Sequence, residues 1–196
     1  PNVGSATACQ LLAALGLPDQ IYAQRATALS RHVPEALARQ LAAPMPADME
    51  KQVQAALEWV QQPGRHVLTL ADPAYPQSLL TIADPPILLY VAGDPAFLQG
   101  PSLAVVGARN ATPGGQENAR AFARHLAGNG WRVVSGLALG IDAAAHEGAL
   151  DAGPQGAGTV AVMGTGIDSI FPSATASWRA WRAACWWWKR PSRAGR

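Results

Sequence analysis

The sequence has few of the residues that build metal centres, disulfide frameworks and membrane spans. Its 196 residues include two cysteines, Cys9 and Cys185, and four histidines without metal-ligand spacing. We therefore expect a reducing compartment and no metal ion or other cofactor. No apolar run reaches the length of about eighteen residues that a membrane span needs, and no signal peptide is present. These absences predict a cytoplasmic protein that does not interact with membranes.

Charged residues are also scarce, at 14% of the chain, and they are unevenly distributed. Residues 1–172 hold all thirteen acidic residues but only nine basic ones, a net charge of −4, whereas residues 173–196 hold six basic residues and no acidic one. Long-range attraction by the body of the chain therefore does not favour a polyanion. Any binding of phosphate has to come from local hydrogen-bond donors.

The motifs of the common nucleotide enzymes and hydrolases are absent. The three glycine turns begin GARNAT, GLALGI and GTGIDS, and none completes the G-x-G-x-x-G fingerprint. A P-loop needs a lysine beside Ser or Thr, but the chain has only Lys51 and Lys189, far from these turns. There is no G-x-S-x-G nucleophile motif. The sequence therefore names no catalytic residue and no cofactor-binding residue.

Residues 1–62 are rich in Ala, Leu and Gln and predict a small unit of short helices. Prolines at positions 18, 34 and 44 separate the helices. Two apolar stripes recur at helical spacing, and we expect both to be core: Leu11, Leu12 and Leu15 in the first, and Met49, Val53, Ala56, Leu57 and Val60 in the second.

From His66 the pattern changes to short apolar strands, HVLTL and ILLYV, followed beyond Pro101 by three repeats of strand, glycine turn and helix. Continuous apolar strands alternating with helices predict an α/β fold with a parallel sheet covered on both faces. Ligands of such sheets bind at the carboxyl ends of the strands. Gly107, Gly136 and Gly164 all fall at this edge.

The stretch VVSGLALGIDAAAH predicts an anion site at this edge. A strand that passes through a glycine turn into a helix leaves unpaired N–H groups at the positive end of the helix dipole. Arg109, two residues after Gly107, has a planar guanidinium that can fork onto a phosphate or stack on a base. The alternative is that Arg109 holds its loop by an ion pair or a carbonyl contact. Asp142 and His146, one helical turn apart, are assigned no chemistry, because an Asp in a first helical turn more often serves the dipole.

Four blocks together resemble one known family: LTLADPAYPQSLLTIADPPILLYVAGD, VVGARNATPGG, VVSGLALGIDAAAHEGAL, and TVAVMGTGID followed by FP. They are similar, in order and spacing, to the DNA-processing protein A family (DprA, also called Smf), over about residues 65–172. The resemblance implies a Rossmann-like domain over residues 63–172 with an incomplete second half of the sheet. It also implies a protein that is not an enzyme, binds single-stranded DNA during natural transformation and helps to load the recombinase RecA.

By the same resemblance, nine residues of two glycine loops would hold the DNA backbone. They are Gly107, Arg109, Asn110, Ser135, Gly136, Leu137, Ala138, Gly140 and Ile141. By the resemblance, members of this family form homodimers through the later half of the sheet. That half is missing here, so we expect this chain to be a monomer or a poorly defined associate.

The first residues, PNVGSATACQLLAALG, resemble the second half of a helix-hairpin-helix or SAM-like unit, with Val3 and Gly4 in the hairpin. Such a hairpin can donate N–H groups to DNA phosphates. A role in packing or in protein contacts is an equal alternative for this unit.

Residues 173–196 depart from the family, and five of the seven tryptophans fall within eleven residues there. Trp, Arg, Ala, Gly and Pro have GC-rich codons, so one hypothesis is a shifted reading frame. The other is a functional segment that uses Arg and Trp to bind bases or membranes. We expect the half sheet to expose an unpaired hydrophobic edge.

Two other classes of function stay open at this point. One is an enzyme acting on nucleotides or nucleoside phosphates on the same fold, for which Asp142, Asp168 and Glu147 are candidate acids by position only. The other is a protein-interaction module that binds neither DNA nor nucleotides.

Overall fold

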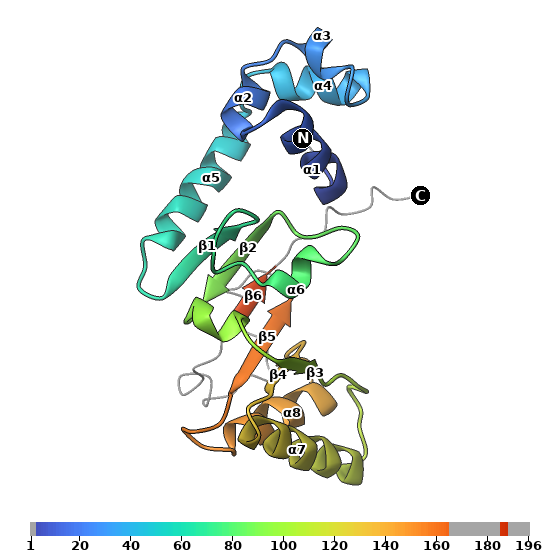
Figure 1. The fold of residues 1–196 in the computed structure, drawn as a ribbon, viewed down its shortest axis with the longest axis vertical. Helices are drawn as coiled ribbons and strands as arrows, with labels where there is room; N and C mark the ends of the chain where they lie inside the picture. The colour runs from blue at the N-terminus through green and yellow to red at the C-terminus, as the bar shows by residue number, and fades with distance from the viewer. Residues whose placement is uncertain (1–2, 165–184, 188–196) are drawn as a thin grey trace. The chain divides into compact units, whose positions relative to one another are not determined.

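The computed structural model describes residues 3–164 and 185–187, which form two compact units (Figure 1). The first unit contains the residues up to Gln62 together with Ser78–Ile87. The second contains Pro63–Gln77 and the described residues from Leu88 onward. The division of the chain at residues 62 and 63 stays a prediction from the sequence.

The first unit is helical. Its elements are α1 (Ser5–Leu15), α2 (Pro18–Tyr22), α3 (Ala26–Leu29), α4 (Glu35–Ala42) and α5 (Ala47–Val60). Proline sets several of these starts, because its fixed φ suits the beginning of a helix and its missing N–H is not needed there. Pro18 is the first residue of α2, and Pro34 and Pro46 precede α4 and α5.

One of the two predicted apolar stripes is core, and the other is not. Leu11 of the first stripe is buried in a cluster with five other residues, Ile21, Leu29, Val33, Ala38 and Leu41. Leu12 and Leu15 pack against this cluster. In the second stripe, however, Val53 and Leu57 are 44% and 54% exposed. Helical spacing identifies an apolar face, but it does not supply the element that covers it.

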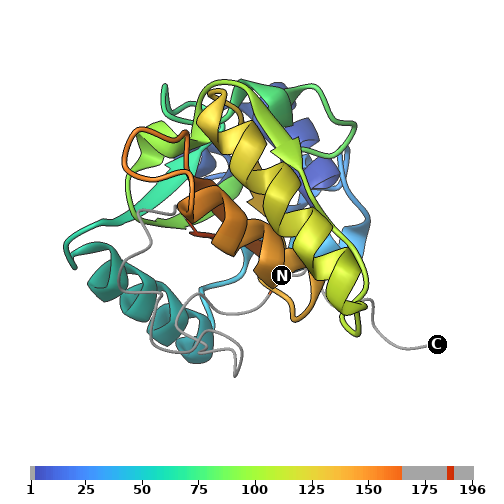
Figure 2. The ribbon, with the colours of Figure 1, turned by 90° about the horizontal axis from the view of Figure 1, so that it is seen from below.

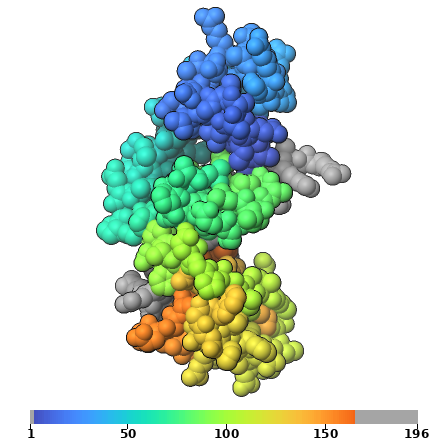
Figure 3. Space-filling model, in the orientation of Figure 1, coloured from blue at the N-terminus to red at the C-terminus, as the bar shows by residue number. Residues whose placement is uncertain are grey.

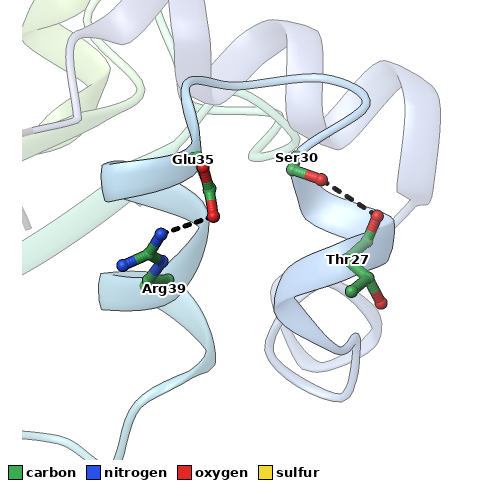
Figure 4. A network of polar contacts seen from close by, with 4 residues as sticks. All are labelled: Thr27, Ser30, Glu35 and Arg39. Atoms are coloured by element: carbon green, nitrogen blue, oxygen red, sulfur yellow. Dashed lines mark hydrogen bonds and ion pairs between the residues drawn. The ribbon is translucent and has the colours of Figure 1, made fainter.

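Local polar contacts hold the surface of α3 and α4, as Figure 4 shows. Ser30 Oγ donates a hydrogen bond of 3.0 Å to the carbonyl oxygen of Thr27. On α4 the Arg39 guanidinium pairs with the Glu35 carboxylate one helical turn earlier. The charge of Arg39 is therefore already compensated. At the start of α1, Gly4 is the N-cap in extended conformation.

The second unit is built on a six-stranded sheet. The strands are β1 (Arg65–Thr69), β2 (Leu88–Ala92), β3 (Ser102–Ala104), β4 (Arg132–Ser135), β5 (Thr159–Met163) and β6 (Cys185–Trp187), in the order β1-β2-β6-β5-β4-β3. Strands β3 to β6 are parallel, whereas β2 is antiparallel to both β1 and β6. The short helix α6 (Gln77–Leu80) and the 3-10 helix η1 (Pro95–Leu98) lie in the connections. This arrangement confirms the predicted α/β fold.

The helices α7 (Pro113–Gly128) and α8 (Ile141–Leu150) follow β3 and β4 and pack side by side (Figures 1 and 2). Both lie on the same face of the sheet, so the prediction of helices on both faces is wrong for the described residues. Successive right-handed crossovers put helices on one face when the strand order does not reverse, and β3, β4 and β5 follow each other without reversal. Val162 of β5 is 38% exposed.

Small residues allow α7 and α8 to come close together. Their shared core consists of Ala123, Ala127, Val133, Ala145 and Ala149. At Gly148 a Cβ atom would overlap the backbone of Arg120 in α7. The guanidinium of Arg120 also pairs with the carboxylate of Glu147 across the two helices. The outer side chains of α7 form part of the surface of this unit (Figure 3).

Strand β6 belongs to the segment 173–196, which was expected from the sequence to differ from the family pattern. It pairs in parallel with β5 and antiparallel with β2. The expectation of an unpaired edge at this side of the half sheet is therefore wrong, because β6 supplies the backbone partner of β5. The other residues of the segment lie outside the described part, and the hypothesis of a shifted reading frame stays untested.

Candidate nucleic-acid interface

The two expected glycine loops start at the same edge of the parallel sheet. Gly136 directly follows β4, and Gly107 follows β3, whose pairing with β4 continues in a hydrogen bond of 2.9 Å from Val105 N–H to the carbonyl oxygen of Val134. The loops also touch, because Ile141 N–H donates to the carbonyl oxygen of Ala108 at 3.2 Å. The structure therefore brings the loop of Arg109 together with the start of α8.

Close approach of the two loops depends on glycine. Gly140 has a φ of +81°, a conformation that other residues rarely adopt, and a Cβ atom there would overlap the carbonyl groups of Ala108 and Arg109. A Cβ atom on Gly107 would lie 2.7–3.0 Å from the side chain of Ile141. These two glycines therefore serve the contact between loops, whether or not a ligand is bound. Leu137 between them also has a positive φ, 59°.

Asp142, in the first turn of α8, already accepts hydrogen bonds from both loops. One carboxylate oxygen accepts from Gly107 N–H at 3.4 Å, and the other accepts from Gly136 N–H at 3.1 Å and Ala138 N–H at 3.5 Å. The side chain is buried, with 6% of the residue exposed. Three of the N–H groups expected to be unpaired thus have a partner within the protein.

Other expected contact residues are also engaged in the protein. Ser135 is buried, and its Oγ donates a hydrogen bond of 2.6 Å to the carbonyl oxygen of Val105. This bond joins the ends of β3 and β4. The N–H of Ile141 is the one that donates to Ala108. Ser135 and Ile141 therefore hold the two loops together.

Arg109 and Asn110 remain exposed at the edge of the sheet. Within residues 3–164 and 185–187, the Arg109 guanidinium makes no hydrogen bond and no ion pair. This differs from Arg132, which donates to the carbonyl oxygens of Phe97 and Gln99 and holds the start of β4. The described residues therefore do not show the alternative role for Arg109, in which its side chain holds the loop by an ion pair or a carbonyl contact.

The positive end of α7 lies directly after Arg109 and Asn110. Thr112 is the N-cap of α7, and its hydroxyl accepts a hydrogen bond of 3.2 Å from Gly115 N–H. Pro113 follows at the first helical position. The positive end of the dipole of this sixteen-residue helix therefore follows Arg109 and Asn110 closely in the chain.

Among the described residues, His146, Asp142 and Glu147 do not form a solvent-facing catalytic group. His146 is buried, and its Nδ1 lies 2.7 Å from Thr159 Oγ1. Because the Thr159 hydroxyl donates to the carbonyl oxygen of Val133, its oxygen accepts the Nδ1 proton of His146. Burial lowers the pKa of His146 to about 4, against the smaller opposing effect of the Asp142 charge. Glu147 is paired with Arg120, and Asp168 lies outside the described residues.

The described residues contain no group of His, Cys, Asp and Glu side chains arranged to bind a metal ion. None of the described helices has the length and apolar character required to cross a bilayer.

Comparison with known proteins identifies the family. The family model of DNA recombination-mediator protein A matches residues 66–182. Protein Smf from Escherichia coli is 37% identical over 122 residues, which cover 62% of this chain and 32% of the relative. DNA processing protein DprA from Streptococcus pneumoniae is 41% identical over 106 residues, covering 54% of this chain and 36% of the relative. This chain therefore spans about a third of the length of these relatives.

Solved structures are similar as well. The X-ray structure of DNA processing protein A from Streptococcus pneumoniae has a TM-score of 0.59 and 27% identity, and the match covers 95% of this chain and 68% of that chain. DNA processing protein A from Helicobacter pylori, whose structure is described in terms of its unique single-stranded DNA binding mode, has a TM-score of 0.51 and 29% identity, covering 63% and 56% of the two chains. Because the family model matches more than half of its length, this chain belongs to the family of DNA recombination-mediator protein A.

Proposed function

We propose that this chain binds single-stranded DNA by its phosphates at the edge formed by the loops after β3 and β4. It does so without base specificity, in the cytoplasm, as a mediator that assists the loading of the recombinase RecA in natural transformation, and not as an enzyme. The chain acts as a monomer and needs no cofactor. Membership of a recombination-mediator family and the single-stranded DNA binding described for the Helicobacter pylori protein support this proposal.

The observation that carries the proposal is the Arg109 guanidinium, which is exposed and has no partner in the described part of the chain. A guanidinium can donate two parallel hydrogen bonds to one phosphate. The adjacent N-terminus of α7 favours a negative charge at the same place. Contacts of this kind are made to the backbone and are indifferent to the base.

The expected contact residues divide into two groups by their present engagement. Arg109 and Asn110 are exposed and supply side-chain donors to the phosphates. The other seven, which form and support the surface beneath the DNA strand, are Gly107, Ser135, Gly136, Leu137, Ala138, Gly140 and Ile141.

The experiment replaces Arg109 with Ala and measures binding of labelled oligo-dT by fluorescence anisotropy over a salt series. We expect binding about tenfold weaker, the effect of losing a charge-assisted contact. The slope of log affinity against log salt should fall by about 0.7, the value for one phosphate contact on a single strand.

The matched control is Arg124→Ala, which removes the same charge from the second half of α7 and should bind like the parent protein. Arg124 is also exposed, and its guanidinium makes no hydrogen bond and no ion pair among residues 3–164 and 185–187. Equal loss in both variants would mean that only net charge matters. A normal salt slope in Arg109→Ala would place the DNA elsewhere. Competition with a nucleoside monophosphate, by contrast, tests the alternative of a nucleotide enzyme, which requires tight and saturable binding of the monomer.

A further inference from the structure

The carboxylate of Asp142 occupies a position at the start of α8 where backbone N–H groups converge and could bind an anion. Three N–H groups from two loops converge on its carboxylate, at 3.1–3.5 Å, and the side chain is buried at the start of α8. N–H donors and the positive end of a helix dipole stabilise an anion at such a position. We call this group of donors, the N–H groups of Gly107, Gly136 and Ala138, the glycine cradle.

The Asp142 carboxylate already occupies the glycine cradle. A Cβ atom on Gly136 would already lie 2.9 Å from the Asp142 carboxylate. An incoming phosphate at the cradle would meet the negative charge of this carboxylate.

We propose that Asp142 is a specificity-determining residue, whose carboxylate is the resident anion of the glycine cradle and closes it to free phosphate and to mononucleotides. A ligand can therefore bind only to the exposed donors around the cradle. These donors bind a single phosphate weakly, but their combined affinity is high for a polymer that presents several phosphates in succession. The inference concerns the same site as the proposed function and rests on it for the identity of the polymer.

The test removes the Asp142 carboxylate by mutation and supplies inorganic phosphate in its place. In Asp142→Ala the cradle keeps its N–H groups, so inorganic phosphate should raise the melting temperature of this variant by about 3 °C or more at ten times its dissociation constant, relative to potassium chloride of equal ionic strength. The parent protein should melt at the same temperature in both salts. Asp151→Ala, which removes an exposed carboxylate at the other end of α8, is the matched control and should behave like the parent.

Loss of stability alone does not decide the question, because any buried carboxylate can be structural. Only the anion-specific rescue supports the proposal. If Asp142→Ala does not fold in chloride, it should fold in phosphate buffer or in formate buffer. A variant that stays unfolded in both buffers contradicts the proposal. A phosphate-specific rise in the melting temperature of the parent protein contradicts it equally.

A second measurement uses the parent protein alone. Phosphate and chloride of equal ionic strength should weaken oligo-dT binding to the same extent, and stronger competition by phosphate would overturn the inference. Absence of any oligo-dT binding would instead refute the proposed function, while the melting experiment would still report on the cradle.

Discussion

His146 is a buried group whose protonation opposes folding. Its pKa is lowered to about 4 in the folded protein, from 6.5 in a model compound, mainly because burial disfavours the charged imidazolium. Between these two values the unfolded chain binds a proton that the folded protein does not. The contribution of His146 to stability is therefore complete above about pH 6.5 and decreases as the pH falls toward 4.

This linkage predicts a loss of about 2 kcal/mol in the free energy of unfolding between pH 7.5 and pH 5.0 that is due to His146. Urea unfolding at the two pH values measures it. The variant His146→Gln, which has no titrating group, should lose about 2 kcal/mol less over the same interval, whatever its stability at pH 7.5. Equal losses in the two proteins would contradict the assignment.

At the scale of single residues, the sequence predicted where the site lies better than it predicted the hydrogen-bond partners of the residues in it. Arg109 is exposed beside a glycine loop, as a guanidinium two residues after Gly107 should be. The role of Asp142 was missed, because one of its donors, Gly107, is 35 residues away in sequence. A local pattern around Gly140 indicates an anion site, but it does not indicate that the protein supplies its own anion.

At the scale of elements, the contact between α7 and α8 depends on one position without a side chain. Glycine in a helix is usually less stable than alanine by about 1 kcal/mol, so Gly→Ala on an open helix surface stabilises. Gly148 should show the opposite sign, because a Cβ atom would overlap the backbone of Arg120.

We therefore expect Gly148→Ala to lower the free energy of unfolding by about 2 kcal/mol or more, the usual cost of overpacking. Gly128→Ala is the control, because Gly128 ends α7 with nothing within 4 Å of its added Cβ atom. Chemical denaturation of both variants gives the comparison. A stabilised Gly148→Ala would show that the two helices separate easily.

The helices and strands were largely predictable from the sequence, but the elements that pack against them were not. Apolar runs and glycine turns located β3, β4, β5 and the two helices that follow. The covering of the sheet was predicted wrongly, because it depends on the order in which strands pair, and strand order is not a property of any single segment. The apolar stripe of α5 was predicted to be core for the same reason, since periodicity does not name a partner.

At the scale of the whole molecule, the two compact units have separate cores. Leu29 is fully buried in the core of the first unit, so Leu29→Ala should destabilise that unit by about 3 kcal/mol. All nine residues of the proposed DNA site belong to the second unit. The variant should therefore keep the affinity of the parent for oligo-dT. Hydrogen exchange of each unit, measured beside anisotropy, separates the two effects.

The control for this comparison is Val133→Ala, which truncates a buried residue of β4 in the second unit. It should accelerate exchange in the second unit and weaken DNA binding. Weaker binding by Leu29→Ala, under conditions where exchange in the second unit is unchanged, would show that the helical unit takes part in binding.

Strand β6 has a consequence for the order in which the protein folds during synthesis. It is the strand through which the antiparallel pair β1 and β2 joins the parallel strands, and its partner Ala92 lies roughly ninety residues before Cys185. Strands β3, β4 and β5 with their helices are translated before β6, and both β2 and β5 wait for it with one edge unpaired. The nascent chain therefore passes through a stage with open strand edges, at which it is most exposed to aggregation.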